Sequence, residues 1–273
     1  MNPAAFAREV RLRRFFSRPS GRAVMVAWAH GPLLGPVPGV DREAIGRLAD
    51  KFATADGLLL SPSMMLGAQD VLARRDRPTL FLLQEWQSVS RPAELLGYEE
   101  GATAPLISVE EAARWGADGV MSYLYVGWRD PQREALEVGR VAETSRACQE
   151  FALLHLVESR AVREEVGPTG LARPDLVRYH TRLAAELGAD LVKTKWTGAD
   201  TFGTVVEGCP VPVLLAGGSR TRDLEEVLAD AREMVAAGAR GLVWGRQIFQ
   251  HPDPRAALER VLEVVHSGLP SAP

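Results

Sequence analysis

Eight short apolar runs, helical-period segments between them and a recurrent Gly-Ala-Asp junction predict an α/β fold, a (β/α)8 TIM barrel with eight parallel strands. The runs are mostly apolar and bounded by Gly, Pro or Asp, as strands buried on both faces should be. In chain order they are Val24–Ala29, Asp56–Ser61, Thr79–Gln84, Gly119–Val126, Phe151–Val157, Asp190–Lys195, Val211–Ala216 and Gly241–Gly245.

Helical spacing of apolar residues fills the segments between these runs. The clearest segments are Asp41–Ala53, Asp130–Cys148, Pro174–Leu187 and Asp223–Ala237. Three helix-to-strand junctions are alike, because a Gly-Ala pair precedes Asp118, Asp190 and Arg240. Glycine is the usual residue just past a helix C-terminus, so the junctions predict a repeated loop from helix to strand. A doubly wound open sheet is the alternative architecture.

The chain of 273 residues contains no recognisable linker, so we expect one TIM-barrel domain over residues 1–273. Residues 1–22 are basic and predict an N-terminal helix or arm. Two segments rich in Gly and Pro, residues 31–39 and 168–174, follow predicted strands. They are either loops of the active face or plain connections.

Composition excludes several classes of protein. With 32 basic and 35 acidic residues the formal net charge is −3, which argues against nucleic-acid binding and attraction to an anionic membrane. Two cysteines without CxxC spacing predict a reducing cytoplasm, and no apolar run predicts a signal peptide or a membrane span. The five histidines lack metal-ligand spacing, so we expect no metal. The sequence has no Walker loop and no GxGxxG after the first predicted strand, and we expect no organic cofactor.

Lysine is rare in this chain, which makes its placement informative. Only Lys51, Lys193 and Lys195 occur among the 32 basic residues, and two of them share one predicted strand. Strand side chains alternate between faces, so Lys193 and Lys195 point the same way. If they point inward, like charge and burial lower the pKa of at least one amine, as a Schiff-base nucleophile requires. Otherwise they extend to solvent or pair with a carboxylate.

Glycine loops follow the last two predicted strands, where (β/α)8 barrels commonly bind phosphate. The first loop contains Gly217, Gly218 and Ser219, and the second contains Gly245 and Arg246. Glycines let backbone N–H groups approach phosphate oxygens. The two loops therefore predict a phosphate site, unless they are ordinary turns with solvated arginines.

Several stretches resemble the archaeal-type class I fructose-bisphosphate aldolase family, a DeoC/FbaB-like group of Schiff-base aldolases. The matching stretches are ADLVKTKWTG at 189–198, VPVLLAGGSRT at 211–221, AGARGLVWGRQIFQHPDP at 237–254 and residues 104–127. The resemblance implies a TIM barrel with an imine-forming lysine at Lys193. It also implies phosphate binding by the glycine loops and a homo-oligomer.

Two positions depart from the family pattern. The resemblance implies an aspartate at position 29 and a general acid/base tyrosine at position 158, but the chain has Ala29 and Glu158. Imine chemistry needs groups that give and take protons. Glu158 is the first candidate if burial raises its pKa, and Glu85 and His30 are the next. Each also has an ordinary interpretation: Glu158 as the ion-pair partner of a lysine, Glu85 as a salt-bridge or surface charge, and His30 as a loop residue.

These observations predict a class I, metal-independent aldolase or carbon–carbon lyase acting on a phosphorylated ketone, such as dihydroxyacetone phosphate, or on a sugar phosphate. Lys193 forms the imine and Lys195 tunes its pKa. One alternative is a degenerate aldolase that binds a phosphorylated ligand without catalysis. Others are a specialised aldolase making a seven-carbon aromatic precursor and an imine-free isomerase with Glu158 as base.

Four tryptophans lie near predicted strand ends and are expected either to pack the barrel or to narrow its pocket: Trp28, Trp86, Trp196 and Trp244.

Overall fold

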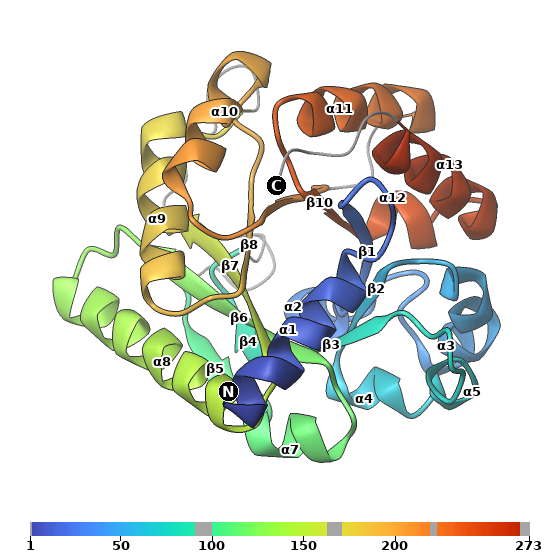
Figure 1. Ribbon diagram of the computed structural model, residues 1–273, viewed down its shortest axis with the longest axis horizontal. Coiled ribbons are helices and arrows are strands. Elements are labelled where there is room, and N and C mark those ends of the chain that lie inside the picture. The colour runs from blue at the N-terminus through green and yellow to red at the C-terminus, as the bar shows by residue number, and fades with distance from the viewer. Residues whose placement is uncertain (1, 91–99, 163–170, 219–222, 268–273) are drawn as a thin grey trace.

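Eight parallel strands close into a barrel in the computed structural model, which describes residues 2–90, 100–162, 171–218 and 223–267 (Figure 1). The barrel confirms the predicted fold class. Its neighbouring strands follow the order β1-β10-β9-β8-β7-β6-β3-β2. The strands are β1 (Ala23–Trp28), β2 (Gly57–Leu60), β3 (Thr79–Leu83), β6 (Gly119–Val126), β7 (Leu154–Ala161), β8 (Leu191–Thr194), β9 (Val213–Ala216) and β10 (Gly241–Trp244).

Helices lie between the strands and surround the barrel (Figure 1). They are α1 (Pro3–Phe15), α2 (Gly31–Leu34), α3 (Arg42–Leu48), the 3-10 helix η1 (Ala49–Phe52), α4 (Pro62–Met65), α5 (Gln69–Leu72), α7 (Val109–Arg114), α8 (Pro131–Glu150), α9 (Pro174–Glu186), α10 (Ala199–Gly208), α11 (Leu224–Ala236), α12 (Arg246–Phe249) and α13 (Pro254–His266). Side chains of Asp130, Asp223 and Asp253 cap the first turns of three of them. Within the described ranges, no helix has the length and apolar character that crossing a membrane requires.

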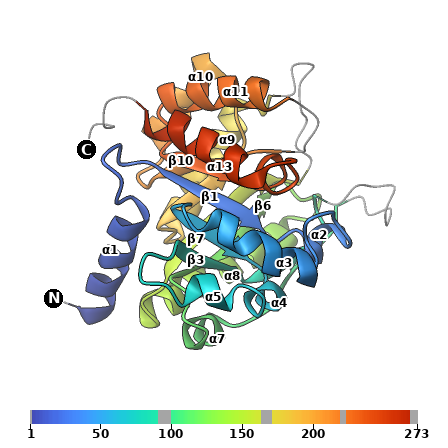
Figure 2. The same cartoon turned by 90° about the vertical axis from the view of Figure 1, so that its right-hand side faces the viewer.

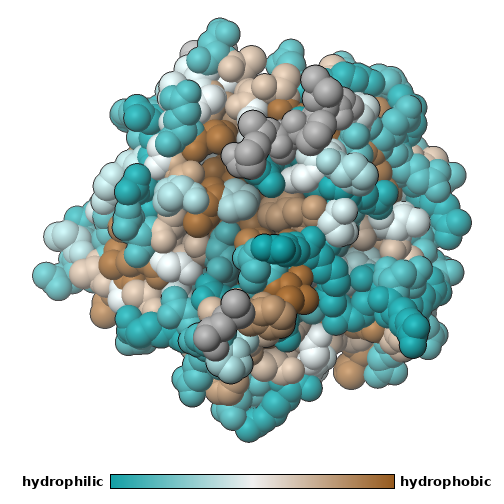
Figure 3. All heavy atoms as spheres, viewed as in Figure 1, coloured by the Kyte–Doolittle hydropathy of each residue, from teal (hydrophilic) through white to brown (hydrophobic). Residues whose placement is uncertain are grey.

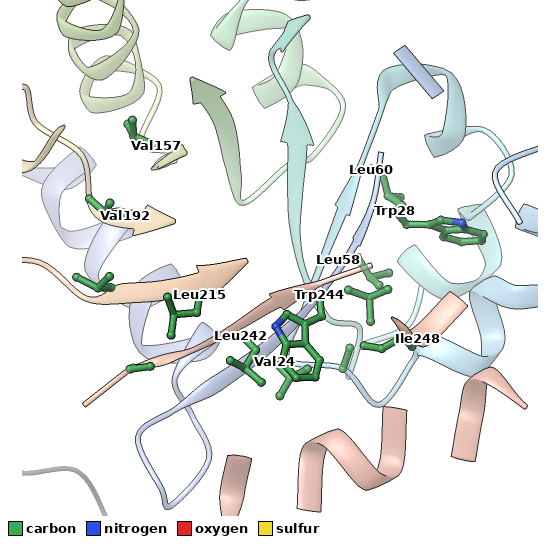
Figure 4. Packing of buried hydrophobic residues seen from close by; sticks show 14 of the residues in the cluster. Val24, Trp28, Leu58, Leu60, Val157, Val192, Leu215, Leu242, Trp244 and Ile248 are labelled. Carbon is green, nitrogen blue, oxygen red and sulfur yellow. The ribbon is translucent and has the colours of Figure 1, made fainter. Parts of the chain in front are cut away.

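The strands bury apolar side chains on both faces. One cluster lies between the strands and the helices, and Figure 4 shows Val24, Leu242 and Trp244 of the strands near Ile248 of α12. A second cluster, which includes Met25, Leu59 and Phe81, takes the alternate strand positions and fills the barrel interior. This double burial explains why the strands read as continuous apolar runs.

The interior changes character along the strands. On β7 the alternate positions are Leu154 and Leu156, followed by Glu158 and Arg160. On β8, Leu191 is followed by Lys193. Interior side chains are therefore apolar at the amino-terminal ends of these strands and charged toward their carboxyl ends.

Helix α1 covers the amino-terminal end of the barrel, on the side away from α2 (Figure 2). Its Phe15 is fully buried, and its ring lies 5.6 Å from that of Phe81 on β3. Arg14 contacts Asp118 at 2.5 Å, Arg8 pairs with Asp190, and Arg18 beyond the helix pairs with Asp56. Figure 3 shows the same face as Figure 1, where hydrophilic atoms surround scattered hydrophobic groups. The basic segment at residues 1–22 thus supplies a helix that closes one end.

The repeated Gly-Ala junctions have the expected geometry. Gly116, Gly188 and Gly238 have φ angles of 77°, 97° and 102°, a left-handed conformation that favours glycine.

Two details of the strands differ from the sequence prediction. The fifth barrel strand runs over Leu154–Ala161 rather than Phe151–Val157, because α8 continues to Glu150 and a turn follows. A two-stranded antiparallel ribbon, β4 (Glu85–Gln87) with β5 (Thr103–Pro105), was not predicted.

Candidate active site

A cavity of about 720 Å³ lies at the carboxyl-terminal end of the barrel. Its walls come from all eight barrel strands and from loops that follow them, including Ala29 and His30 after β1, Leu83 on β3 and Ala216 on β9. Active sites of (β/α)8 barrels lie at this end. The cavity brings together the predicted residues His30, Glu158, Lys193, Lys195, Gly217, Gly218, Gly245 and Arg246.

A buried ion pair joins two of these residues. The Lys193 ammonium donates a hydrogen bond to Oε2 of Glu158 over 2.6 Å, and the two residues are 8% and 7% exposed. They occupy paired positions on the neighbouring strands β8 and β7, so their side chains enter the barrel side by side. The sequence left ion pairing with a lysine open for Glu158, and the structure has that pairing. The pair places an amine and a proton acceptor in direct contact.

The charge state of Glu158 differs from the sequence expectation. Burial acts to raise the pKa of this carboxyl, as predicted. Lys193 and Arg160 outweigh burial, with a smaller contribution from His30, so the pKa is lowered instead. Glu158 is therefore a carboxylate at neutral pH, and it begins any reaction as a proton acceptor.

Two further cations line the same part of the cavity. Lys195 follows the last residue of β8 and still faces the cavity, as the alternation predicted. Arg160 lies two positions after Glu158, with 4.0 Å between its guanidinium and the Glu158 carboxylate, and it donates a hydrogen bond to Ser90 Oγ over 2.9 Å. The parity that selects Glu158 would also have selected Arg160.

His30 lies in the cavity wall as a neutral imidazole. Burial, and then the charges of Arg246 and Lys193, lower its pKa to about 4. Its ring meets that of Phe249 at 5.4 Å, and its buried Nδ1 has no hydrogen-bond partner among the described residues. At neutral pH His30 has no charge to contribute.

The two glycine loops meet beside Arg246. Gly218 has a φ of 70°, and its carbonyl oxygen accepts a hydrogen bond from Arg246 over 3.0 Å. A Cβ atom at Gly217 would lie 2.7 Å from the Trp244 ring, so a larger residue does not fit there. Ser219, the remaining predicted phosphate ligand, lies outside the described residues. The loops therefore combine close backbone approach with a cation.

The structure does not bring Glu85 into the cavity. Its side chain is fully buried behind the wall, where it pairs with Arg140 of α8 and accepts a hydrogen bond from the backbone N–H of Tyr123 over 2.8 Å. The expectation that Glu85 transfers protons to substrate is not supported, whereas its salt-bridge interpretation fits. The pairing of β3 with β6 ends at Leu83 and Met121. Beyond that point the Glu85 carboxylate, rather than a neighbouring strand, accepts the hydrogen bond of the Tyr123 backbone N–H.

Comparison with known proteins decides the family. The family model for DeoC/LacD family aldolases matches residues 25–251. The chain belongs to the DeoC/LacD aldolase family. It is 31% identical to an uncharacterized aldolase of Saccharolobus solfataricus over 95% of this chain and 94% of the relative. The predicted resemblance to the aldolases is confirmed.

Two more relatives of this DeoC/LacD aldolase bear on its chemistry. The 2-amino-4,5-dihydroxy-6-oxo-7-(phosphonooxy)heptanoate synthase of Streptomyces griseus is 29% identical over 97% of this chain and 92% of the synthase. A solved archaeal fructose-1,6-bisphosphate aldolase, with its catalytic lysine covalently bound to the carbinolamine intermediate, is 28% identical. That structure matches with a TM-score of 0.78 over 96% of this chain and all of its own.

Sequence reasoning missed several cavity residues of this DeoC/LacD aldolase. Tyr123, Gln87 and Ser90 line the cavity, and nothing in the sequence showed which face of their segments turns inward.

Among the four tryptophans near strand ends, Trp196 lines the cavity, whereas Trp28 and Trp244 belong to the cluster between the strands and the helices. Nowhere in the described ranges do three His, Cys, Asp or Glu side chains gather closely enough to hold a metal ion.

Proposed function

We propose that this aldolase forms a Schiff base between Lys193 and a phosphorylated ketone, of which dihydroxyacetone phosphate is the simplest. The observation that carries the proposal is the buried Lys193 amine, 2.6 Å from a carboxylate that can take its proton, in a cavity shared with two glycine loops. The solved aldolase with a lysine-bound carbinolamine supports the same assignment. No metal or organic cofactor enters the scheme.

The reaction begins with proton transfer from the Lys193 ammonium to the Glu158 carboxylate. The neutral amine then attacks the ketone carbon, a nitrogen–carbon bond forms, and a proton moves from nitrogen to oxygen to give a carbinolamine. Loss of water leaves an iminium ion. When the ketone carries a hydroxyl on its β carbon, the iminium accepts the electron pair of the bond between the α and β carbons as that bond breaks, which leaves an enamine on Lys193. Glu158, again a carboxylate, takes the proton from the hydroxyl that becomes the aldehyde.

The ketone's phosphate is assigned to Gly217, Gly218, Gly245 and Arg246, and we extend this set to Ser219. Four cations and two carboxylates are among the described residues that line the cavity: Arg160, Lys193, Lys195 and Arg246, with Glu158 and Asp230. This excess of positive charge supports an anionic ligand. Lys195, the second lysine of the motif, is proposed to favour the neutral amine of Lys193 through like-charge repulsion.

Borohydride trapping tests the proposal. The protein is incubated with dihydroxyacetone phosphate and sodium borohydride, and intact mass and peptide mapping locate the adduct. We expect a stable adduct on Lys193, which Lys193→Met loses together with turnover, a fall of at least about 10⁴-fold. Lys51→Met is the matched control because Lys51 is outside the cavity-lining set, and it should retain both. An active Lys193→Met variant would contradict the mechanism.

The Streptomyces relative favours a specific acceptor aldehyde as a second candidate function. The compound in its name is a β-hydroxyketone that divides into dihydroxyacetone phosphate and a four-carbon aldehyde bearing an amine and a carboxylate. Arg160, on the far side of Lys193 from the phosphate loops, offers a guanidinium to such a carboxylate. Aspartate 4-semialdehyde and glyceraldehyde 3-phosphate, each supplied with the donor ketone, test this choice by mass spectrometry of the products.

Two further assignments complete the proposal. We place the enzyme in a reducing cytoplasm, which the two free, buried cysteines Cys148 and Cys209 support. We also propose a homo-oligomer, supported by exposed apolar side chains such as Leu136 and Tyr179 on the outer helices. Analytical ultracentrifugation tests the assembly.

A protein that binds dihydroxyacetone phosphate but forms no adduct with it or with other ketones would favour the degenerate aldolase instead.

A further inference from the structure

Three polar side chains form a row across adjacent strands of the barrel. Tyr123 on β6 is paired in register with Glu158 on β7, and Glu158 is paired with Lys193 on β8. Residues paired in register on parallel strands point to the same side of the sheet. All three line the cavity. A phenol, a carboxylate and an amine therefore lie side by side at one depth.

The Tyr123 side chain is held firmly in this row. It is 2% exposed, and its ring stacks on that of Tyr125 with centroids 6.0 Å apart. The backbone N–H of Tyr123 donates to Glu85, and its carbonyl oxygen accepts from Arg140 over 2.9 Å. The buried Glu85–Arg140 pair thus fixes the strand from behind at the position that presents the phenol.

The phenol also has a defined protonation state. Burial and the neighbouring Glu158 charge raise the pKa of Tyr123 well above its ordinary value, so the hydroxyl keeps its proton. The Gln87 side chain hydrogen-bonds the hydroxyl, and Gln87 Oε1 is itself occupied by the backbone N–H of Ser90 over 2.8 Å. When the Gln87 amide N–H donates this bond to the phenolic oxygen, the phenol's own hydrogen is left to donate elsewhere.

Building on the proposed function, we infer that Tyr123 is the acid that protonates the leaving oxygen of the Lys193 carbinolamine. The carbinolamine needs a donor because hydroxide is a poor leaving group. The neighbouring groups start in the wrong state for this task. Glu158 rests as a carboxylate and holds a proton only after it takes one from Lys193, and His30 is a neutral imidazole whose pKa is about 4. Tyr123 is protonated and lies beside the reacting pair.

The proton balance closes within the row. Lys193 first passes one proton to Glu158, and its nitrogen passes a second to the ketone oxygen during addition. Tyr123 then donates its proton to that oxygen, the carbon–oxygen bond breaks, water leaves, and the nitrogen electron pair forms the iminium bond. The Tyr123 phenolate recovers the proton held by Glu158. One hydrogen of the water therefore comes from the Lys193 ammonium and the other from Tyr123. The second ammonium proton, passed through Glu158, replaces the one that Tyr123 gave, so Glu158 and Tyr123 return to their starting states.

Tyr123→Phe tests the inference, with Tyr125→Phe as the matched control. Tyr125 is a buried phenol two positions along the same strand, bonded to Ser90 Oγ over 2.9 Å and outside the cavity-lining set. Dihydroxyacetone phosphate is the probe. Two rates are measured: formation of the borohydride-trapped adduct, and exchange of a hydrogen on the hydroxymethyl carbon with D2O by NMR. Circular dichroism confirms folding.

We expect Tyr123→Phe to slow both rates by about 10²-fold or more, the range of lost acid–base catalysis, with little change in KM. Tyr125→Phe should stay within about threefold of the unmodified protein. If Lys193 forms the adduct but Tyr123→Phe retains both rates, the role of Tyr123 is wrong and the Schiff base stands. If the unmodified protein forms no adduct, the proposed function fails and the role of Tyr123 fails with it.

Discussion

At the amino-terminal end of the barrel, Asp56, Asp118 and Asp190 each face an arginine of the N-terminal segment and also accept a backbone N–H from a neighbouring strand. At the carboxyl-terminal end, Arg160, Lys193, Lys195 and Arg246 surround a cavity with Glu158 and Asp230. At the first end a helix of this chain covers the aspartates. At the second end the cations line a space large enough for a small molecule.

The two ends of the barrel differ in the source of the charge that neutralises their ionised side chains. At the closed end the sequence encodes both signs, so the charges hold α1 against the strands. Among the described residues that line the open end, cations outnumber carboxylates, which suits the anionic ligand that we propose. A side chain whose charge is neutralised by a structural ion pair attracts a ligand only weakly. One fold can therefore place stabilising ion pairs at one end of the barrel and ligand-binding charges at the other.

Removing the apolar anchor of the closed end should break stability without touching the open end. Phe15 is fully buried against the barrel interior, so Phe15→Ala should lower the free energy of unfolding by about 3–5 kcal/mol. Urea unfolding measures the loss, and kcat measured on the folded protein should be unchanged. Phe6→Ala is the control on the same helix because Phe6 is 56% exposed. A large fall in kcat for Phe15→Ala would show that the two ends are coupled.

Removing a cation from the open end should affect the ligand rather than the fold. Arg246 contacts the Gly218 carbonyl from a glycine loop of the cavity, so Arg246→Met should weaken binding of dihydroxyacetone phosphate by about 10–100-fold, the worth of one charged hydrogen bond. The concentration dependence of borohydride trapping measures this loss. Unphosphorylated dihydroxyacetone is the matched probe, and its trapping should hardly change. Equal losses for both ketones would argue that Arg246 shapes the cavity instead of holding phosphate.

The fold was predictable because it depends on repetition. Apolar runs buried on both faces, and glycine at the turn after each helix, are local signals that recur along the chain. Alternation along LVKTK also placed Lys193 and Lys195 together near the carboxyl end of their strand, whereas the choice of Lys193 as the imine-forming lysine came from the family resemblance. The strand count placed the two glycine loops after the last two strands, and it is their glycines and arginines that singled out Gly217, Gly218, Gly245 and Arg246.

The rest of the site depends on neighbours that the sequence does not order. The pKa of Glu158 moves down rather than up because Lys193 and Arg160 stand beside it, and burial alone predicted the opposite direction. Glu85 lies behind the wall because the unpredicted β4–β5 ribbon turns it toward Arg140. Tyr123 could be found only once β6 and β7 were in register.

The smallest predicted effect concerns a neutral group at the open end. His30 has a pKa of about 4 in the folded protein against an ordinary value of 6.5, so the unfolded chain binds a proton more readily between these values. Stability from this residue is present above pH 6.5 and is lost as the pH falls toward 4. Lowering the pH from 7 to 5.5 should cost about 1 kcal/mol through His30.

His30→Gln should remove this part of the acid sensitivity, and urea unfolding at the two pH values measures it. Some sensitivity should remain in the variant, because burial also lowers the pKa of His155, to about 3, where its ring bonds Ser122 and Ser145 outside the barrel interior. An unchanged pH dependence in His30→Gln would mean that the His30 pKa is the same in the folded and unfolded chains, so that the imidazole is charged in the folded protein below about pH 6.5. His30 would then add to the cations of the open end and become a proton donor in its own right, which would sharpen the contrast between the two ends.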